Sequence, residues 1–192
     1  MRSMIADRLV VRVLWVPIAL CLCCPAIESQ AFAQGKGCDD EIRRAAGKYY
    51  PGYLVVGLDG LDPDLRQYLA AIDHRQEPGC VKGDFDGDGT QDYALLLRKQ
   101  IDETTTERLV VLLGRADGSF TPVSLEILKD RLGSFYIRPL PPGKIGKWAE
   151  VEGSKRESMT LEHPGIELVL YEAASRAYFW SNGKFHSVQT SD

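Results

Sequence analysis

Four aspartates within nine residues form the strongest chemical signal in this sequence. The stretch from Asp84 to Asp92 places carboxylates at its positions 1, 3, 5 and 9, and Gly89 stands at position 6. Carboxylates this close repel one another unless a cation lies between them. A glycine at position 6 permits a sharp turn on which alternate side chains converge, and the carbonyl oxygen at position 7 adds a further ligand. The spacing therefore predicts an oxygen cage made by Asp84, Asp86, Asp88, Thr90 and Asp92.

The chemistry of this ligand set favours Ca²⁺ over other divalent metals. All of its donors are hard oxygens, and it contains neither cysteine nor histidine. Ca²⁺ accepts about 6 to 8 oxygen ligands in a flexible geometry, whereas Zn²⁺ prefers nitrogen and sulfur and Mg²⁺ demands a stricter octahedron. We therefore expect one Ca²⁺ with a structural role in this loop. The alternative is an ordinary turn, because aspartate and glycine are common in turns.

Two features separate the loop from an EF-hand. Position 12 is Leu95 instead of a glutamate, and the residues from Tyr93 to Leu97 indicate a buried strand rather than a helix. Residues 83–123 instead resemble one unit of the FG-GAP/VCBS repeat, the calcium-loop repeat of integrin-type β-propeller blades. After the acidic loop, the resemblance rests on Leu112-Leu113-Gly114 followed by Asp117-Gly118-Ser119-Phe120. It implies the order loop, strand, strand, turn. The sequence holds one such loop, whereas a propeller has typically about 4 to 8 blades.

The N-terminal segment has the features of a secretory signal peptide. Arg2, Arg8 and Arg12 precede an apolar run that extends from Val13 to Cys24, and Ala31-Phe32-Ala33 follows as an A-x-A site. This run of 12 residues is shorter than the roughly 20 that a membrane span requires. We therefore expect residues 1–33 to be removed and the protein to be periplasmic or secreted. A lipoprotein is the alternative, because the apolar run ends with Cys21, Cys23 and Cys24.

Residues 34–192 then form a mature chain of 159 residues, enough for a single domain with a sizeable core. This chain carries 20 basic and 25 acidic residues, a net charge of −5. Such a charge argues against binding to nucleic acid or to an anionic membrane. Two cysteines remain, and an even number in an exported chain predicts one disulfide, between Cys38 and Cys80. A reactive thiol is the alternative.

The mature chain predicts an α+β fold, with two N-terminal helices packed on a mainly antiparallel sheet of about seven to nine strands. The first helix is expected from Cys38 to Tyr50, and the second from Asp64 to Ile72 after a proline in its first turn. Residues 139–143 are rich in proline and predict a rigid connector, while Asn182-Gly183 predicts a hairpin. Strands are expected at 53–56, 80–82, 93–98, 108–114, 120–126, 135–138, 156–161, 166–171, 177–180 and 185–189.

No catalytic motif stands out in the sequence. It has no G-x-S-x-G elbow, no H-E-x-x-H and no phosphate-binding loop, and its three histidines, His74, His163 and His186, are scattered. We therefore expect a non-enzymatic, exported calcium-binding domain of structural or binding type. Its partner would be an envelope or extracellular protein or glycan.

Two other functions remain open at this point. An envelope hydrolase or hydrolase inhibitor would bind glycan or protein through an aromatic face. An adhesion or assembly module would use an exposed apolar patch or a free sheet edge. The aromatic residues concerned are Tyr171, Tyr178, Phe179, Trp180 and Trp148.

Overall fold

The computed structural model describes residues 38–72, 77–101, 103–146 and 158–192. Several sequence predictions lie outside these ranges: the signal peptide at 1–33, the lipoprotein cysteines within it, His74 and Trp148.

The described residues form two α-helices and eleven strands. The helices are α1 (Asp40–Tyr49) and α2 (Pro63–Ile72), with a short 3-10 helix at Leu58–Gly60 between them. The strands are β1 (Leu54–Val55), β2 (Cys80–Gly83), β3 (Asp92–Ile101), β4 (Thr104–Gly114), β5 (Phe120–Leu128), β6 (Phe135–Leu140), β7 (Gly143–Gly146), β8 (Ser158–Leu161), β9 (Gly165–Leu170), β10 (Ala174–Ser181) and β11 (Lys184–Ser191).

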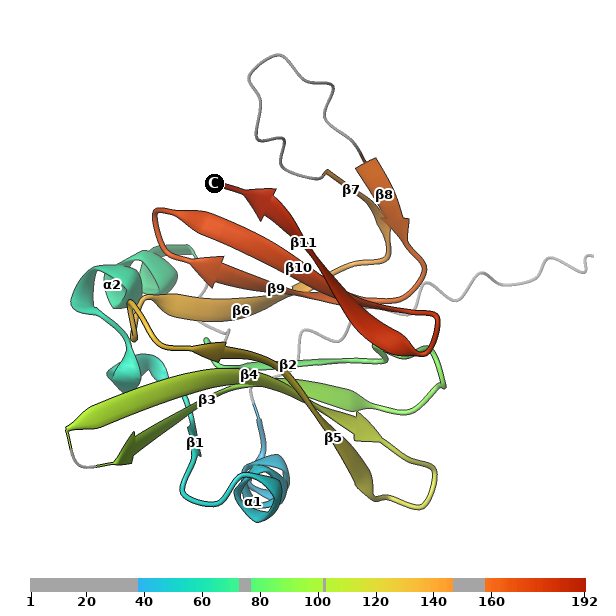
Figure 1. Ribbon diagram of the computed structural model, residues 1–192, viewed down its shortest axis with the longest axis horizontal. Coiled ribbons are helices and arrows are strands. Elements are labelled where there is room, and N and C mark those ends of the chain that lie inside the picture. The colour runs from blue at the N-terminus through green and yellow to red at the C-terminus, as the bar shows by residue number, and fades with distance from the viewer. Residues whose placement is uncertain (1–37, 73–76, 102, 147–157) are drawn as a thin grey trace, which may run out of the picture. The chain divides into compact units, whose positions relative to one another are not determined.

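The strands form two larger sheets and a small ribbon, and every pairing is antiparallel. The first sheet has the order β1-β3-β4-β5, with β2 also paired to β3. The second has the order β11-β10-β9-β6, and β7 pairs with β8 alone. In Figure 1 the two larger sheets lie face to face, with α1 below the first sheet and α2 beside them. This is a β-sandwich with one helix on an outer face.

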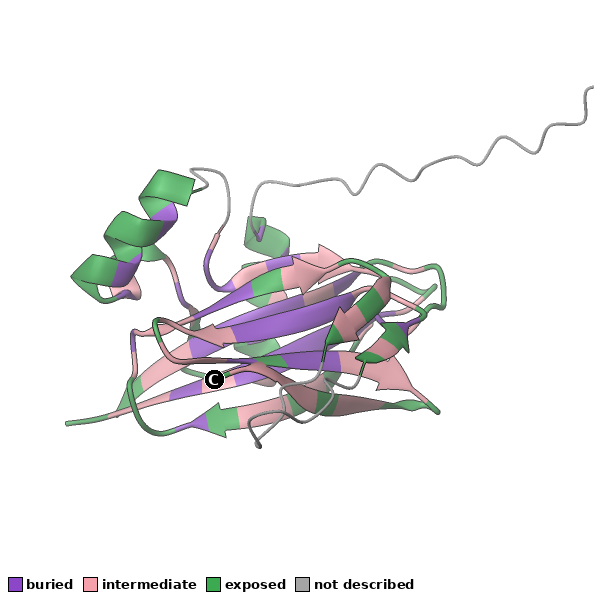
Figure 2. Ribbon diagram, turned by 90° about the horizontal axis from the view of Figure 1, so that it is seen from above, coloured by how far each residue is buried: buried purple, intermediate pink, exposed green. Residues whose placement is uncertain are grey.

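The central strands β3 and β4 are buried on both faces. Successive side chains of a strand point to opposite faces, so Ala94 and Leu96 enter the core between the two sheets, while Leu95 and Leu97 face α1. All four are fully buried, and Figure 2 shows the same pattern as continuous purple along the central strands. Two-sided burial explains why these strands have continuous apolar runs instead of alternating apolar and polar residues.

The predicted α+β class is wrong, because the described residues are mainly β. The two helices are present, but each has only 10 residues. Helix α1 covers one face of the first sheet, through Ile42 and Ala46, and the opposite face is covered by the second sheet. Helix α2 adds Leu65 and Leu69 to the core between the sheets and forms no layer of its own. The sequence pattern predicts one sheet covered by helices, whereas a second sheet covers most of the face opposite α1.

The expected connector at 139–143 is also different in the structure. Pro139 and Leu140 belong to strand β6, and Gly143 already begins β7. A proline cannot donate its backbone nitrogen to a neighbouring strand, so it is tolerated where one side of a strand is unpaired. Strand β6 is an edge strand that pairs with β9 on one side, which satisfies this condition.

The start of α1 is fixed in two ways. The carboxylate of Asp39 accepts a hydrogen bond from the amide of Ile42 at 3.0 Å and caps the helix. The predicted disulfide partners, Cys38 and Cys80, lie at bonding distance, with their Cα atoms 5.7 Å apart. The bridge ties α1 to β2, and a disulfide of this kind contributes about 2–4 kcal/mol to stability.

Neither described helix is both long and apolar enough to cross a membrane.

Candidate metal centre

Three of the predicted ligands converge in the loop between β2 and β3. Asp84, Asp86 and Asp88 each offer one carboxylate oxygen, and these three oxygens lie within 4.8 Å of one another. The loop turns sharply because Gly87 and Gly89 have positive φ angles of 75° and 84°, which glycine adopts without steric cost.

Backbone amides of the loop donate hydrogen bonds to all three carboxylates. The amide of Gly89 donates to Asp84 Oδ2 at 3.0 Å, and the amide of Asp88 donates to Asp86 Oδ1 at 3.3 Å. The amide of Thr90 donates to Asp88 Oδ1 at 2.7 Å, and this bond, helped by the charge of Arg115, lowers the pKa of Asp88. These contacts favour the charged form of Asp88. The expected role of Thr90, through its carbonyl oxygen, remains a prediction.

One oxygen of the cluster has no partner. Asp84 Oδ1 is buried and accepts no hydrogen bond from any described residue. A buried carboxylate oxygen without a donor is costly, by about 1–3 kcal/mol or more. The donor set, three carboxylates with one oxygen unsatisfied, fits a hard cation such as Ca²⁺, although the cluster by itself does not select calcium from other metals.

Asp92 is not brought into this cluster. Its side chain is fully buried at the start of β3, and each oxygen accepts one backbone hydrogen bond, from Phe85 at 2.7 Å and from Gly114 at 2.8 Å. Burial raises the pKa of Asp92 to about 6, partly offset by these two bonds, and the charge of Asp86 acts in the same direction as burial. In this structure Asp92 fastens the loop to the end of β4.

Arg115 completes the loop and was missed by the sequence reasoning. Its Nη1 atom lies 3.1 Å from Asp86 Oδ2 and 3.2 Å from Asp88 Oδ2. The register of β3 and β4 pairs Tyr93 with Leu112, so β4 ends beside the loop and the next residue reaches the acids. The sequence could have indicated this contact only by pairing the residues of β3 and β4 along their antiparallel hairpin. This pairing required the register of the two strands, and the bounds predicted from the sequence, 93–98 and 108–114, are shorter than the observed strands Asp92–Ile101 and Thr104–Gly114.

His163 also contacts the loop, through the turn between β8 and β9. Its imidazole ring lies against Gly87, at the place where a Cβ atom on residue 87 would stand. Gly87 is therefore required both for its positive φ angle and for the space that the ring occupies. The sequence alone gave no sign of this contact.

The aromatic residues near the C-terminus do not share one face. Tyr178 is buried in the core between the sheets, and Trp180 packs against that core. The rings of Trp180 and Phe185 form an edge-to-face pair, with their centres 5.1 Å apart. Phe179 points to the opposite face of β10, where it stacks on His186. Alternation along the strand thus separates the ring of Phe179 from those of Tyr178 and Trp180.

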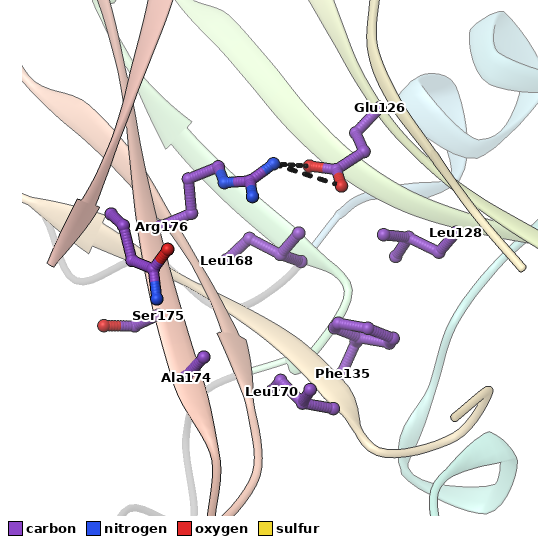
Figure 3. A pocket seen from close by; sticks show the side chains of 9 residues that line it. Glu126, Leu128, Phe135, Leu168, Leu170, Ala174, Ser175 and Arg176 are labelled. Atoms are coloured by element: carbon purple, nitrogen blue, oxygen red, sulfur yellow. Dashed lines mark hydrogen bonds and ion pairs between the residues drawn. The ribbon is translucent and has the colours of Figure 1, made fainter. Parts of the chain in front are cut away.

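A pocket of about 280 Å³ opens between the two sheets (Figure 3). Its walls are mainly apolar and include Leu128, Phe135 and Leu168. Arg176 crosses one side and pairs with Glu126 at 3.2 Å, and the hydroxyl of Tyr178 donates to the same carboxylate. The two charged side chains of this pocket, Arg176 and Glu126, thus form an ion pair with each other, which is typical of a structural role.

A second buried carboxylate, Glu107 on β4, also has a structural environment. Its side chain is inaccessible to solvent, and its Oε1 accepts hydrogen bonds from Arg98 and from the amide of Gly133. Burial raises the pKa of Glu107, and the bond from Arg98 opposes that effect. The arrangement ties β3 and β4 to the turn before β6.

In comparisons with known proteins, no family model, no curated protein and no solved structure matches the chain. The structure does have the order loop, strand, strand, turn over residues 84–119. The resemblance of residues 83–123 to an FG-GAP/VCBS repeat nevertheless remains a prediction, because no comparison identifies that repeat.

Proposed function

We propose that this protein is an exported, non-enzymatic domain whose acidic loop binds one structural Ca²⁺ through Asp84, Asp86 and Asp88. The observation that carries the proposal is the buried, unpartnered Asp84 Oδ1 beside two further converging carboxylates. A divalent cation supplies the positive charge that this oxygen lacks. The carbonyl oxygen of Thr90 and water are the natural donors for the remaining positions of a calcium shell.

The benefit of the metal would be stability. A ligand that binds the folded protein and not the unfolded chain stabilises the fold by mass action, by about 2.7 kcal/mol when its concentration is 100 times the dissociation constant. The loop joins β2 to β3, and both β3 and Phe85 of the loop belong to the core. Fixing the loop therefore fixes the entry into the central strand of the first sheet.

Two observations support the exported location within this proposal. The Cys38–Cys80 pair is at bonding distance, and disulfides persist in oxidising compartments. The N-terminal sequence has the order of features of a signal peptide. Extracellular calcium-binding modules have dissociation constants of about 10⁻⁴–10⁻³ M, so a loop with few protein ligands suits that environment.

The test is thermal unfolding of the mature chain in Ca²⁺ and in chelator, with calorimetric titration of Ca²⁺ alongside. The variant is Asp86→Asn with Asp88→Asn, which keeps the side-chain shape and the amide bonds to the loop while removing two charges. We expect the wild type to melt several degrees higher in Ca²⁺ and the double variant to show no difference. Asp130→Asn, an exposed carboxylate outside the loop, is the matched control and should respond as the wild type does.

Equal melting temperatures of the wild type in Ca²⁺ and in chelator, together with no heat of binding, would contradict the proposal. A response to Mg²⁺ as strong as the response to Ca²⁺ would contradict its calcium preference.

A further inference from the structure

We propose that Arg115 is an internal counter-ion of the acidic loop that competes with Ca²⁺ for Asp86 and Asp88. Its guanidinium group partly neutralises these two carboxylates in the metal-free protein and thereby lowers the affinity of the loop for the metal. The inference rests on the proposed calcium site and deepens it, because it names the residue that sets how strongly the site binds.

The geometry of Arg115 is that of a bridge between two acids. One nitrogen, Nη1, lies 3.1 Å from Asp86 Oδ2 and 3.2 Å from Asp88 Oδ2. The side chain of Asp86 is only 6% exposed, so this contact is shielded from water on one side. Charges in a partly buried contact interact more strongly than charges in bulk water. The two oxygens concerned belong to residues that the metal also needs.

Arg115 is held in this position from its own hairpin. Its Nε atom donates to Thr121 Oγ1 at 3.0 Å, and its backbone amide donates to the carbonyl oxygen of Ser119 at 2.9 Å. The amide of Gly118 donates back to the carbonyl oxygen of Arg115 at 2.8 Å. An anchored arginine loses little side-chain entropy when it forms the two ion pairs, so they are stronger than those of an unrestrained surface arginine.

The counter-ion is incomplete, which leaves the loop able to take up a metal ion. Arg115 reaches Asp86 and Asp88, but Asp84 Oδ1 stays without a partner. One positive charge also leaves three carboxylates with a net negative charge. The metal-free loop is therefore stable enough to keep its shape and still attracts a divalent cation, which must compete with the guanidinium group for two of its ligands.

The experiment compares Arg115→Gln with the wild type by calorimetric Ca²⁺ titration and by thermal unfolding in chelator. Removing one positive charge and two ion pairs should tighten Ca²⁺ binding by about five- to tenfold. The same variant should melt at a lower temperature in chelator, because the acids lose their counter-ion, and should show a larger increase on adding Ca²⁺. Arg115→Lys keeps the charge without the planar fork and should fall between the two.

Arg176→Gln is the matched control. It makes the same change of charge and also breaks an ion pair, with Glu126, but that carboxylate lies outside the loop. We expect its Ca²⁺ affinity to equal that of the wild type. A change of similar size in both arginine variants would show that net charge alone is responsible and would overturn the inference.

The outcomes separate this inference from the proposed function. If the wild type binds Ca²⁺ and Arg115→Gln binds it equally or more weakly, the calcium site stands and the counter-ion role is wrong. If neither protein binds Ca²⁺, the proposed function itself is wrong. If only Arg115→Gln binds, Arg115 blocks the site in the wild type, which supports competition and contradicts a resident structural metal.

Discussion

The β4–β5 turn and the β10–β11 turn are built from similar residues and face different surroundings. The first has the sequence Arg115 to Phe120 and the second Trp180 to Phe185, each with an aspartate or asparagine before a glycine. In the first turn Gly118 has a φ of 80°, and in the second Asn182 and Gly183 have φ angles of 50° and 76°. Both are ordinary tight hairpins with a glycine in the left-handed region.

The difference lies in the residue that opens each turn. Arg115 lies beside the acidic loop and pairs with two of its carboxylates, whereas Trp180 occupies the equivalent place in the second turn and packs on Phe185. Local turn chemistry is thus shared, and the neighbouring strand ends decide what the turn does. The first turn joins β4 to β5 at the point where β4 ends beside the loop, and the second joins β10 to β11 in the other sheet.

The largest expected effect is a difference in the unfolding free energy lost when alanine replaces two glycines with nearly equal φ angles. One glycine lies in the acidic loop and the other in the second turn. Gly87 has a φ of 75° and faces His163, while Gly183 has a φ of 76° and open space where a Cβ would stand. Gly183→Ala should cost about 1–2 kcal/mol of unfolding free energy, from the left-handed conformation alone. Gly87→Ala should cost roughly 1 kcal/mol more, because the imidazole must move. Chemical denaturation measures both.

A double-mutant cycle identifies the source of that extra cost. When His163→Ala is combined with Gly87→Ala, the penalty for the added methyl group should fall to the level of Gly183→Ala. If the penalty stays the same without the ring, contact with His163 is not what distinguishes the loop from the second turn.

The next expected effect is a pH dependence that belongs to the loop region. Burial raises the pKa of Asp92 from 3.8 to about 6, so the folded protein holds this proton more tightly than the unfolded chain. The resulting stabilisation is complete below about pH 4 and is lost as the pH rises through about 6. Between pH 5 and pH 7 the loss is about 1 kcal/mol.

Denaturation in chelator at these two pH values tests this prediction. The stability of the wild type relative to Asp92→Asn, which does not titrate, should fall by about that amount from pH 5 to pH 7. A difference for Asp92→Asn that grows with pH would mean that the two amide bonds outweigh burial and lower the pKa of Asp92.

The smallest expected effects concern the turn residues that the two hairpins share. Asp117 accepts a hydrogen bond from the amide of Ser119 at 2.9 Å, and Asn182 occupies a left-handed position that asparagine tolerates. Asp117→Ala and Asn182→Ala should each cost about 1 kcal/mol or less. Neither should change the difference in melting temperature between Ca²⁺ and chelator. A change for Asp117→Ala would extend the calcium response from Arg115 to the whole turn.

Parts of the fold followed directly from sequence patterns. The two helices, most strands and the Asn182-Gly183 hairpin lie where capping residues, apolar runs and turn residues placed them. The error in fold class arose because continuous apolar runs such as Ala94 to Leu97 show that both faces of a strand are covered but not by what. Helix α1 covers one face of strand β3, and a second sheet, formed by residues from Phe135 onwards, covers the other.

The sequence by itself determined the features that depend on short spacing: three carboxylates that converge because alternate residues of a tight loop share one side, and the glycine that permits the turn. It also predicted the pairing of Cys38 with Cys80. Only the tertiary structure decided what surrounds the loop. Asp92 accepts hydrogen bonds from two backbone amides. The register of β3 and β4 places Arg115 beside the loop, and the turn between β8 and β9 places His163 against Gly87. The reason is physical: contacts between distant segments depend on strand register and sheet packing, which local propensity does not fix.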